Sequence, residues 1–348
     1  MKIKCNLYWL NYVALGAVFL NLLPSCSTDC DCEDLKVKNE IYYYNNKPFS
    51  GICYAQVFEY KKEKHFKDGK YSGVYKVWNA ADQLVCESFF NEGYREGLTT
   101  IWYENGQKYL QDSYMKGKKD GLAVIWFENG GKKTEENYKT GVNDGKSSEW
   151  FENGKLRFEK NYKIGEKHGD WQFWYDNGNK KSEVHYEDGK EFGKIASWYE
   201  NGQKELEGNL DDGLQNGEWL AWHENGNLKE SGVYEKGHEQ GKWISYYNNG
   251  EKKMEKQFKR GIEHGPSIEW YPNGSKKVEV FYKNGLPNGA SKTWFSNGKL
   301  KSVISYKDGN QDGKYTIYDE NGKKKEEGYY ENGKLVNPKD DDDDDPVF

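Results

Sequence analysis

One stretch of the sequence decides the fold: Tyr138-Lys-Thr-Gly141-Val-Asn-Asp-Gly145-Lys-Ser-Ser-Glu-Trp150-Phe-Glu-Asn153-Gly154-Lys-Leu-Arg-Phe-Glu. The Trp150 slot recurs every 24 residues, without an insertion, from Trp78 to Tyr318. Tyrosine also fills this slot at Tyr246, and tryptophan fills the others. A strict period of this length indicates an array of repeats, each of which is one supersecondary unit.

The composition of each repeat predicts a β-hairpin. Asn-Gly follows the Trp slot by three residues from Asn105-Gly106 to Asn321-Gly322, and both residues tolerate a positive φ, so we expect a type I′ turn there. The flanking runs, such as 122–127, are rich in strand formers. A second motif, Gly-x-x-x-Gly, closes each repeat, as at Gly117 and Gly121, and returns the chain for the next hairpin. These glycines argue against helix, because each costs about 1 kcal/mol relative to alanine.

The sequence therefore predicts an all-β fold, an elongated single-layer antiparallel meander of 24-residue β-hairpin repeats over residues 44–335. A degenerate first unit, 44–65, precedes the next unit by 22 residues. Because one hairpin is only marginally stable, neighbours must stabilise each other. Trp and the following aromatic residue are expected on opposite faces. The residues assigned to this repeat framework are Trp102, Asn105, Gly106, Trp126, Asn129, Gly130, Trp150, Asn153, Gly154, Trp174, Asn177 and Gly178.

The charge is concentrated at one end of the chain. The formal net charge of −6 equals that of the six aspartates 340–345, so the body is balanced. No basic patch stands out, and no nucleic-acid partner is expected. A block of like charges is typical of disorder, so residues 336–348 are predicted to form an acidic disordered tail.

The first 26 residues have the pattern of an export signal. Lys2 and Lys4 precede an apolar run, 7–23, that is short and interrupted for a membrane span. The sequence Leu23-Pro-Ser-Cys26 resembles a bacterial lipobox, which implies lipidation of Cys26 and a place in the outer membrane, at its surface. An ordinary signal peptide and an uncleaved anchor are the alternatives. Residues 27–43 are then expected to be an acidic tether.

The other cysteines suggest no metal site. Cys30 and Cys32 have no matching Cys or His pair, which argues against zinc. Cys53 and Cys86 lie in neighbouring units, and an exported compartment permits a disulfide between them. The sequence leaves open whether they pair.

Catalysis and cofactors are not expected. The six histidines are scattered, and neither an HExxH motif nor a Walker-type loop occurs. The Gly-x-x-x-Gly segments lack the helix whose first amides would hold a phosphate. No catalytic, cofactor or metal residue is therefore assigned.

Binding is the remaining class of function. Three additional tryptophans, Trp171, Trp219 and Trp243, are candidates, because exposed aromatic stripes mark binding sites. The alternative is that these rings only hold the array together. On the return strands, Lys133 and Arg157 lie two residues before glutamates, which predicts a surface ladder of opposite charges.

The repeat pattern also carries a family resemblance. Tyr-x-x-Gly-x-x-x-Gly, then Trp-Tyr-x-Asn-Gly, then Lys-x-x-x-Glu is similar to the MORN repeat variant of the YwqK-family toxin–antitoxin antitoxins. The segment Lys-Pro-Phe-Ser-Gly at 47–51 resembles an opening unit of those proteins. The resemblance implies an extended meander with a binding or scaffolding role.

These observations together predict a non-enzymatic, membrane-anchored repeat lipoprotein whose extended surface binds protein or glycan. The alternative is an antitoxin or immunity protein that neutralises a partner toxin. The sequence does not name the ligand or the face that binds it.

Overall fold

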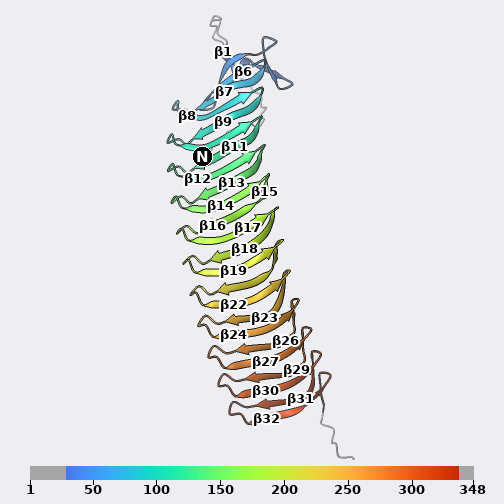
Figure 1. Cartoon of the computed structure of the whole chain (residues 1–348). Coiled ribbons are helices and arrows are strands. Elements are labelled where there is room, and N and C mark those ends of the chain that lie inside the picture. Colours follow the sequence, from blue (N-terminus) through green and yellow to red (C-terminus); the bar gives the residue numbers. More distant parts are fainter. Residues whose placement is uncertain (1–28, 337–348) are drawn as a thin grey trace, which may run out of the picture. The chain divides into compact units, whose positions relative to one another are not determined.

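The structure is a computed structural model that describes residues 29–336, and these form two compact units that are divided in sequence between Glu166 and Lys167. Apart from the short 3-10 helix η1 (Cys32–Asp34), all the elements described are strands. In each unit, consecutive hairpin strands pair antiparallel in chain order (Figure 1). This arrangement confirms the predicted antiparallel meander of hairpin repeats.

The first unit contains a short N-terminal group of strands and then the hairpins. The N-terminal strands are β1 (Asp29–Asp31), β2 (Lys36–Lys38), β3 (Ile41–Tyr44) and β4 (Lys47–Pro48). The hairpin strands are β5 (Gly51–Val57), β6 (Tyr60–Lys67), β7 (Lys70–Trp78), β8 (Leu84–Asn91), β9 (Tyr94–Trp102), β10 (Lys108–Met115), β11 (Lys118–Trp126), β12 (Lys132–Lys139), β13 (Val142–Trp150) and β14 (Leu156–Lys163). The two-residue strand β15 (Glu166–Lys167) falls at the boundary of the units in sequence.

The second unit continues the same pattern, and several of its long strands are divided into a two-residue and a six-residue piece. Its strands are β16 (Gly169–Trp174), β17 (Lys180–Glu187), β18 (Lys190–Trp198), β19 (Lys204–Asp211), β20 (Leu214–Gln215), β21 (Gly217–Trp222), β22 (Leu228–Glu235), β23 (His238–Tyr246), β24 (Lys252–Lys259), β25 (Ile262–Glu263), β26 (Gly265–Trp270), β27 (Lys276–Lys283), β28 (Leu286–Pro287), β29 (Gly289–Trp294), β30 (Leu300–Lys307), β31 (Asn310–Tyr318), β32 (Lys324–Glu331) and β33 (Lys334–Val336).

Type I′ turns lie at the edge where the Gly-x-x-x-Gly motif begins. Between the paired residues Met115 and Lys118, Lys116 and Gly117 have φ values of 49° and 79°. A two-residue loop with both φ values positive is the type I′ hairpin turn. The same turn recurs in both units, and we call this edge the I′ edge. Its turns are Asp68-Gly69, Glu92-Gly93, Lys116-Gly117, Thr140-Gly141, Ile164-Gly165, Asp188-Gly189, Asp212-Gly213, Lys236-Gly237, Arg260-Gly261, Asn284-Gly285, Asp308-Gly309 and Asn332-Gly333.

The prediction of a type I′ turn at Asn-Gly is wrong. At that edge φ is positive at Gly106 (82°) but not at Asn105. The amide of Tyr103 donates to the carbonyl oxygen of Gln107 (2.8 Å), and that of Gly106 donates to the carbonyl oxygen of Tyr103 (3.0 Å). A loop of this length is built on a type I turn that ends in one left-handed residue. Asparagine serves a different purpose there, because its side-chain oxygen accepts from the amide of Gln107 at 2.9 Å.

The second glycine of Gly-x-x-x-Gly marks a bulge in the strand. Gly121 has a φ of 98°, and the pairing of β10 with β11 shifts register between Asp112 and Tyr114. A Cβ atom built on Gly121 would lie 3.3 Å from the Cβ atom of Ser113. Such bulges bend a strand and increase its twist, which is why each repeat needs a glycine here.

Side chains alternate between two faces, as predicted. Arg157 contacts both residues that flank Trp150, with its guanidinium 2.7 Å from the Glu149 carboxylate and 5.7 Å from the Phe151 ring centre. Trp150 itself is covered by the Lys132 ammonium group, 5.9 Å from the ring centre. We call the side that carries the 24-residue Trp slot the Trp face, and the other side the opposite face.

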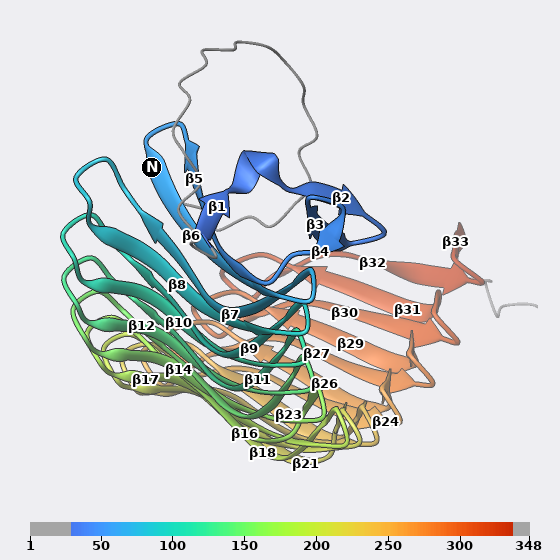
Figure 2. The same cartoon turned by 90° about the horizontal axis from the view of Figure 1, so that it is seen from above.

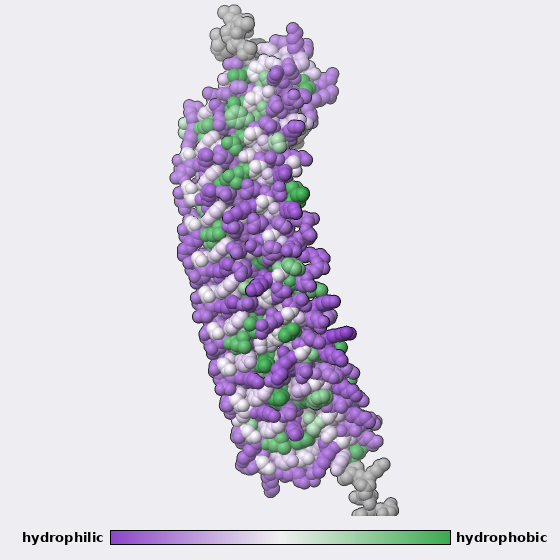
Figure 3. Space-filling model, viewed as in Figure 1, coloured by the Kyte–Doolittle hydropathy of each residue, from purple (hydrophilic) through white to green (hydrophobic). Residues whose placement is uncertain are grey.

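The hydrophobic core is thin. In the first unit, one cluster of buried residues lies on the opposite face of β7–β9 and contains Tyr75, Val77, Val85, Cys86, Phe90 and Ile101. Most other apolar side chains are only half-buried, because a single layer of sheet leaves both faces near solvent. Figure 3 accordingly shows mainly hydrophilic residues on the visible side of each unit, with hydrophobic residues scattered among them.

Residues 29–50 form a cap on the first hairpin, where a solvated tether was expected over 27–43. Strand β1 pairs parallel with β5, and β2, β3 and β4 form a separate small sheet. Figure 2 shows that small sheet on the inner side of the curve made by the first strands. Phe49 and Phe66 are buried together with Cys53, and Tyr42 packs on this cluster. The acidic residues of this segment are therefore part of the folded structure from Asp29 onward.

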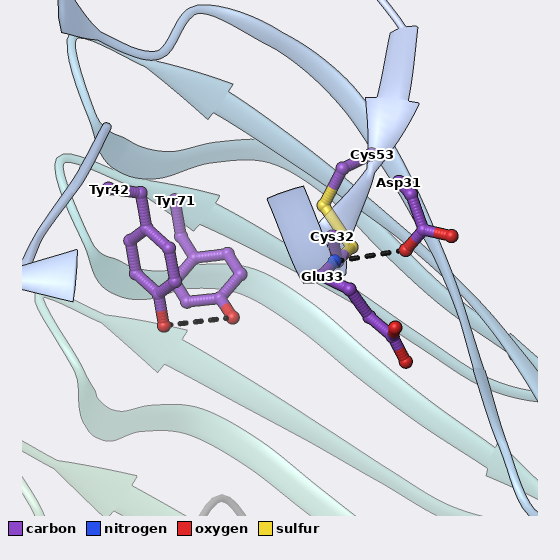
Figure 4. The surroundings of a disulfide bond; sticks show 6 residues. All are labelled: Asp31, Cys32, Glu33, Tyr42, Cys53 and Tyr71. Carbon is purple, nitrogen blue, oxygen red and sulfur yellow. Dashed lines mark hydrogen bonds between the residues drawn. A yellow bond between two sulfur atoms is a disulfide. The ribbon is translucent and has the colours of Figure 1, made fainter. Parts of the chain in front are cut away.

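A disulfide bond fixes the cap to the array. Cys32 in η1 and Cys53 in β5 are joined, with their Cα atoms 5.0 Å apart (Figure 4). The pairing of Cys53 with Cys86 is thus corrected, because Cys86 belongs to the other cluster, around β8. Cys30 keeps a free thiol, and burial together with Asp34, Asp31 and Asp29 raises its pKa to about 11. The sequence could not reveal this bond, because η1 brings Cys32 over β5 only when the cap folds back.

The 22-residue spacing of the first unit follows from a shorter hairpin. Gly51 pairs with Phe66 in the β5–β6 hairpin, whereas the equivalent Gly73 pairs with Phe90 in the β7–β8 hairpin. The difference lies in the loop, since only Phe58 and Glu59 separate the last paired residues of β5 and β6.

We predict that Cys32→Ala lowers the free energy of unfolding by about 3 kcal/mol, since the disulfide closes a loop of 21 residues. Denaturant titration of the first unit's transition would measure the loss, and reduction of the unmodified chain should reproduce it. Cys30→Ala, which keeps the bond, is the control. Equal losses in both variants would contradict the assigned pairing.

We also predict that Ile164→Asn stabilises the chain. Ile164 is 74% exposed and has a φ of 52°, a region in which a β-branched residue is strained. Asparagine occupies the same turn position at Asn284 and Asn332 with similar φ values. The expected gain is about 1 kcal/mol in chemical denaturation. The reverse change, Asn284→Ile, should lower stability, and an effect of the same sign in both variants would refute the explanation.

Candidate functional site

Hydrogen bonds at the I′ edge couple each repeat to the one before it. The amide of Gly117 donates to the carbonyl oxygen of Arg95 at 2.9 Å, and that of Gly261 donates to the carbonyl oxygen of Glu239 at 2.9 Å. The preceding turn residue is often held by a side chain, as when Asp120 Oδ2 accepts from the Thr140 amide at 2.9 Å. In the first hairpins the cap takes this role, because the Gly69 amide donates to the carbonyl oxygen of Phe49 at 2.7 Å.

A second set of hydrogen bonds couples the repeats at the Asn-Gly edge. Asn105 Nδ2 donates to the carbonyl oxygen of Glu128 at 3.0 Å, and the Tyr103 hydroxyl donates to that of Trp126 at 2.7 Å. In the second unit, Asn177 Nδ2 donates in the same way to the carbonyl oxygen of Glu200 at 2.8 Å. The asparagine framework residues therefore link turns and are not free to bind a ligand. The other framework residues at this edge are Gly106, Asn129, Gly130, Asn153, Gly154 and Gly178, and each of these four glycines has a positive φ.

On the Trp face, lysines cover the tryptophans. Lys252 lies 5.6 Å from the ring centre of Trp270 in the next repeat and 3.1 Å from Glu255 in its own. A hydrogen bond from Lys242 is the largest cause that lowers the pKa of Glu255, and Lys252 adds to it. Trp126 and Trp150 are covered in the same way by Lys108 and Lys132, and all four framework tryptophans, Trp102, Trp126, Trp150 and Trp174, are half-buried. These contacts connect neighbouring repeats, and each is worth about 0.5–1 kcal/mol at an exposed site.

The predicted charge ladder uses a different lysine. Glu135 pairs with Lys132 and not with Lys133, and Glu183 pairs with Lys180 at 2.6 Å. Lys133 instead lies on the opposite face, 5.6 Å from the ring centre of Phe127. The register shift at each Trp slot causes this difference, because it moves Lys132 onto the Trp face.

The residue type at the position of Lys132 also varies with a longer period, which the pattern of a single repeat does not reveal. Leucine replaces lysine there at Leu84, Leu156, Leu228 and Leu300, which are 72 residues, or three repeats, apart. All four leucines are half-buried. Every third repeat therefore has a leucine at the position where the other repeats have a lysine.

The three candidate tryptophans lie on the opposite face and are packed against the sheet. The Trp243 ring covers Gly232, where an added Cβ atom would lie 2.1 Å from the ring, and Trp219 covers Gly208 in the same way. The Trp243 indole N–H donates to the carbonyl oxygen of Val233 at 3.3 Å. Only 7% of Trp171 and 9% of Trp243 is exposed. This burial favours the packing role for these rings and leaves little of their surface for a ligand.

The residues that sequence reasoning missed here are the glycines beneath the rings. Gly208 and Gly232 lie inside strands and have no turn role. Gly328 in β32 is a third example, because Tyr315 lies over it. The Tyr315 hydroxyl donates to Glu326 at 2.7 Å, and this hydrogen bond raises the pKa of Tyr315 to about 12. An isolated glycine in a strand pattern was the available signal.

The I′ edge differs from the faces, since its outer side chains are exposed and vary from turn to turn. In the second unit, Leu214, Ile262 and Leu286 are about half exposed. A shallow pocket at this edge is lined by Lys259, Arg260, Ile262, His264 and Asn284. Cations, an imidazole and an amide around one apolar side chain are suited to hold a carboxylate.

Eight segments of the chain match the MORN repeat variant. They are residues 95–116, 143–163, 167–188, 215–236, 239–260, 263–284, 287–308 and 311–332. The chain belongs to the MORN repeat variant family. Each matched segment runs from just after one I′ turn to the next, so a MORN repeat in this protein begins and ends at the I′ edge.

Other comparisons add nothing on function. No curated protein matches the chain. Two solved structures, titled "Crystal Structure of TcdB2-TccC3-Cdc42" and "Crystal Structure of TcdB2-TccC3", are 10% identical and cover 80% of this chain with a TM-score of 0.18. The MORN repeat chain spans 18% of the length of each. A likeness this low carries no argument about fold or function.

Two further observations concern the described residues alone. Within 29–336, no group of His, Cys, Asp and Glu side chains is placed to hold a metal ion. No helix in this range is long and apolar enough to cross a membrane. The proposed lipid site, Cys26, and the acidic tail beyond residue 336 lie outside the described residues.

We predict that Gly232→Ala destabilises the MORN array by about 2 kcal/mol, because the new methyl group overlaps the Trp243 ring. In a Trp243→Ala background the cost should largely disappear, and a double-mutant cycle in denaturant would measure the coupling. Ser231→Ala, on the neighbouring residue, is the control and should change stability by less than about 0.5 kcal/mol. Additive effects of the two changes would contradict the packing role of Trp243.

Proposed function

We propose that this MORN repeat protein is a non-enzymatic scaffold that binds a partner macromolecule, protein or glycan, along its exposed edges and faces. The observation that carries the proposal is that different positions of the repeat have different roles. Turn glycines, asparagines and the Trp slot couple the repeats, whereas the outer side chains of the I′ edge are exposed and change from turn to turn, as at Lys236, Arg260 and Asn284. Variable side chains on an invariant frame are what a recognition surface requires.

The partner test uses affinity capture with the full chain, followed by binding of the purified partner and by a glycan array. A protein or a glycan that binds at micromolar concentration or tighter supports the proposal. Failure of both screens would contradict it. The identity of the captured partner also separates the two roles considered from the sequence, because a toxin indicates an immunity protein and a surface ligand indicates a receptor.

We also propose that a lipid on Cys26 holds the array at a membrane surface. The support is the distance along the chain, since β1 begins at Asp29 and is tied to the array by β5 and by the Cys32–Cys53 bond. Three residues span at most about 10 Å, so a lipid on Cys26 would place the cap next to the membrane. A short tether of this kind would fix the first repeat near the surface.

We predict that Cys26→Ala releases the protein from the membrane fraction, because a lipid anchor contributes about 0.8 kcal/mol for each buried CH₂ group. Fractionation followed by immunoblotting is the measurement, with Cys30→Ala as the matched control that should stay in the membrane. A Cys26→Ala protein that remains membrane-bound would show that the anchor is elsewhere.

A further inference from the structure

One part of the I′ edge in the second unit is strongly basic. The turn residues and their neighbours change from acidic, at Asp211 and Asp212, to net basic over the next four turns, which carry five cations and two carboxylates, Glu235 and Asp308. The cations are Lys236, Lys259, Arg260, Lys283 and Lys307, and all five are exposed. We call these five residues the basic turn segment.

The charge of this segment is not neutralised by the fold. On the strands of the same unit, several lysines are paired, as Lys276 is with Glu279 at 2.8 Å. By contrast, none of the five cations takes part in an ion pair found among residues 29–336. Two carboxylates near these turns have other partners, since Glu263 pairs with Lys256 and Asp308 accepts a hydrogen bond from Asn288 Nδ2 at 3.1 Å. Glu235, next to Lys236, is exposed.

Apolar side chains lie between the cations. Ile262, Phe281 and Leu286 are 51%, 48% and 49% exposed, respectively, and all belong to the hairpins that carry Lys259 and Lys283. An edge with exposed cations and exposed apolar groups fits a partner that is acidic and partly apolar.

The pocket at Arg260 has side chains that can donate hydrogen bonds to a carboxylate. It is lined by Lys259, Arg260, Ile262, His264 and Asn284. His264 Nδ1 accepts a hydrogen bond from the backbone N–H of Asn284 at 3.4 Å. In the neutral ring, Nε2 therefore carries the proton and is a donor. A guanidinium, an ammonium and an imidazole N–H thus surround the same small space.

The spacing of the turns restricts the conformation of the partner. Neighbouring turns are two strands apart, or about 9.6 Å. A polyproline II segment advances about 9.3 Å for every three residues and needs no hydrogen bonds from a sheet edge. Side chains at every third position of such a segment would therefore meet successive turns.

We propose that the basic turn segment binds a stretch of a partner protein in the polyproline II conformation, with Asp or Glu at every third position. One carboxylate occupies the pocket between Arg260 and His264, and others meet Lys236, Lys283 and Lys307. The intervening apolar residues contact Ile262 and Leu286. This inference rests on the proposed scaffold function and gives the chemistry of its partner.

The probe is a fluorescent twelve-residue peptide, Glu-Pro-Pro repeated four times, titrated with the full-length protein and followed by anisotropy. One control peptide has the same composition with its four glutamates adjacent. A second replaces every glutamate with glutamine. The proposal requires that the first peptide binds about tenfold more tightly than either control, and that its affinity falls as salt is raised.

The test variant neutralises four cations of the basic turn segment, and its change at Arg260 uses a residue that this chain already places in an equivalent turn. The test variant combines Arg260→Asn, as at Asn284, with Lys236→Gln, Lys259→Gln and Lys283→Gln. The control removes four exposed lysines from the strands of the same unit through Lys194→Gln, Lys229→Gln, Lys292→Gln and Lys325→Gln. Binding should weaken about tenfold in the test variant and less than about twofold in the control, because the loss must depend on position and not on net charge.

Every outcome decides the proposal. Equal affinity for the three peptides, or equal losses in the two variants, would overturn it. Peptide binding that appears only after residues 337–348 are removed would mean that the chain's own acidic tail occupies the edge. Tighter binding to phosphatidylserine vesicles, lost in the test variant, would mean that the edge meets lipid, and both results would overturn the partner assignment.

The scaffold function and this site can fail separately. If the captured partner binds the test variant as tightly as the unmodified chain, the site is wrong and the scaffold function stands. If neither protein nor glycan binds the unmodified chain, the scaffold function fails, whatever the peptide does.

Discussion

The hydrogen bonds that join successive turns are the constraint on which the rest of the structure depends. At one edge the amide of each I′ glycine, such as Gly117, donates to the repeat before it, and at the other edge Asn105 donates to the repeat after it. A hairpin that gained or lost residues would break one of these connections. Equal repeat length is therefore a condition of pairing, which explains why no insertion occurs from Trp78 to Tyr318. Only the first hairpin is shorter, and there the cap supplies the missing acceptor through Phe49.

The sequence predicted the hairpins and their order but placed the type I′ turn at the wrong edge. Both turns contain a glycine with positive φ, and Asn-Gly is the strongest composition signal for a type I′ turn. What decides the turn is the length of the loop between paired residues, which the sequence does not display. Trp102 pairs with Lys108, whereas Met115 pairs with Lys118. The tight loop then forces positive φ even on Ile164, a residue whose type opposes that conformation.

The features that could not be predicted depend on contacts between distant residues. The Cys32–Cys53 bond exists because the cap folds back onto β5, and the burial of Trp243 depends on Gly232 beneath it. The sequence alone does not show that a glycine beneath a tryptophan lets its ring lie flat on the sheet. The basic turn segment escaped notice for a different reason: its residues are 24 apart in sequence, so no local patch of charge appears until the hairpins stack.

The length of the basic turn segment is matched to what a regular peptide could follow. The repeat of the turns, about 9.6 Å, exceeds three residues of polyproline II by about 0.3 Å, so the mismatch grows to about 1 Å over four turns. Flexible lysine side chains can absorb that difference, but a longer contact would drift out of register. The central turns, with Lys259, Arg260 and Lys283, carry no acidic turn residue, whereas the outer turns of the segment include Glu235 and Asp308. Repeats of equal length thus produce a regular surface. Its binding specificity is set by the few side chains that the hydrogen bonds between turns do not hold.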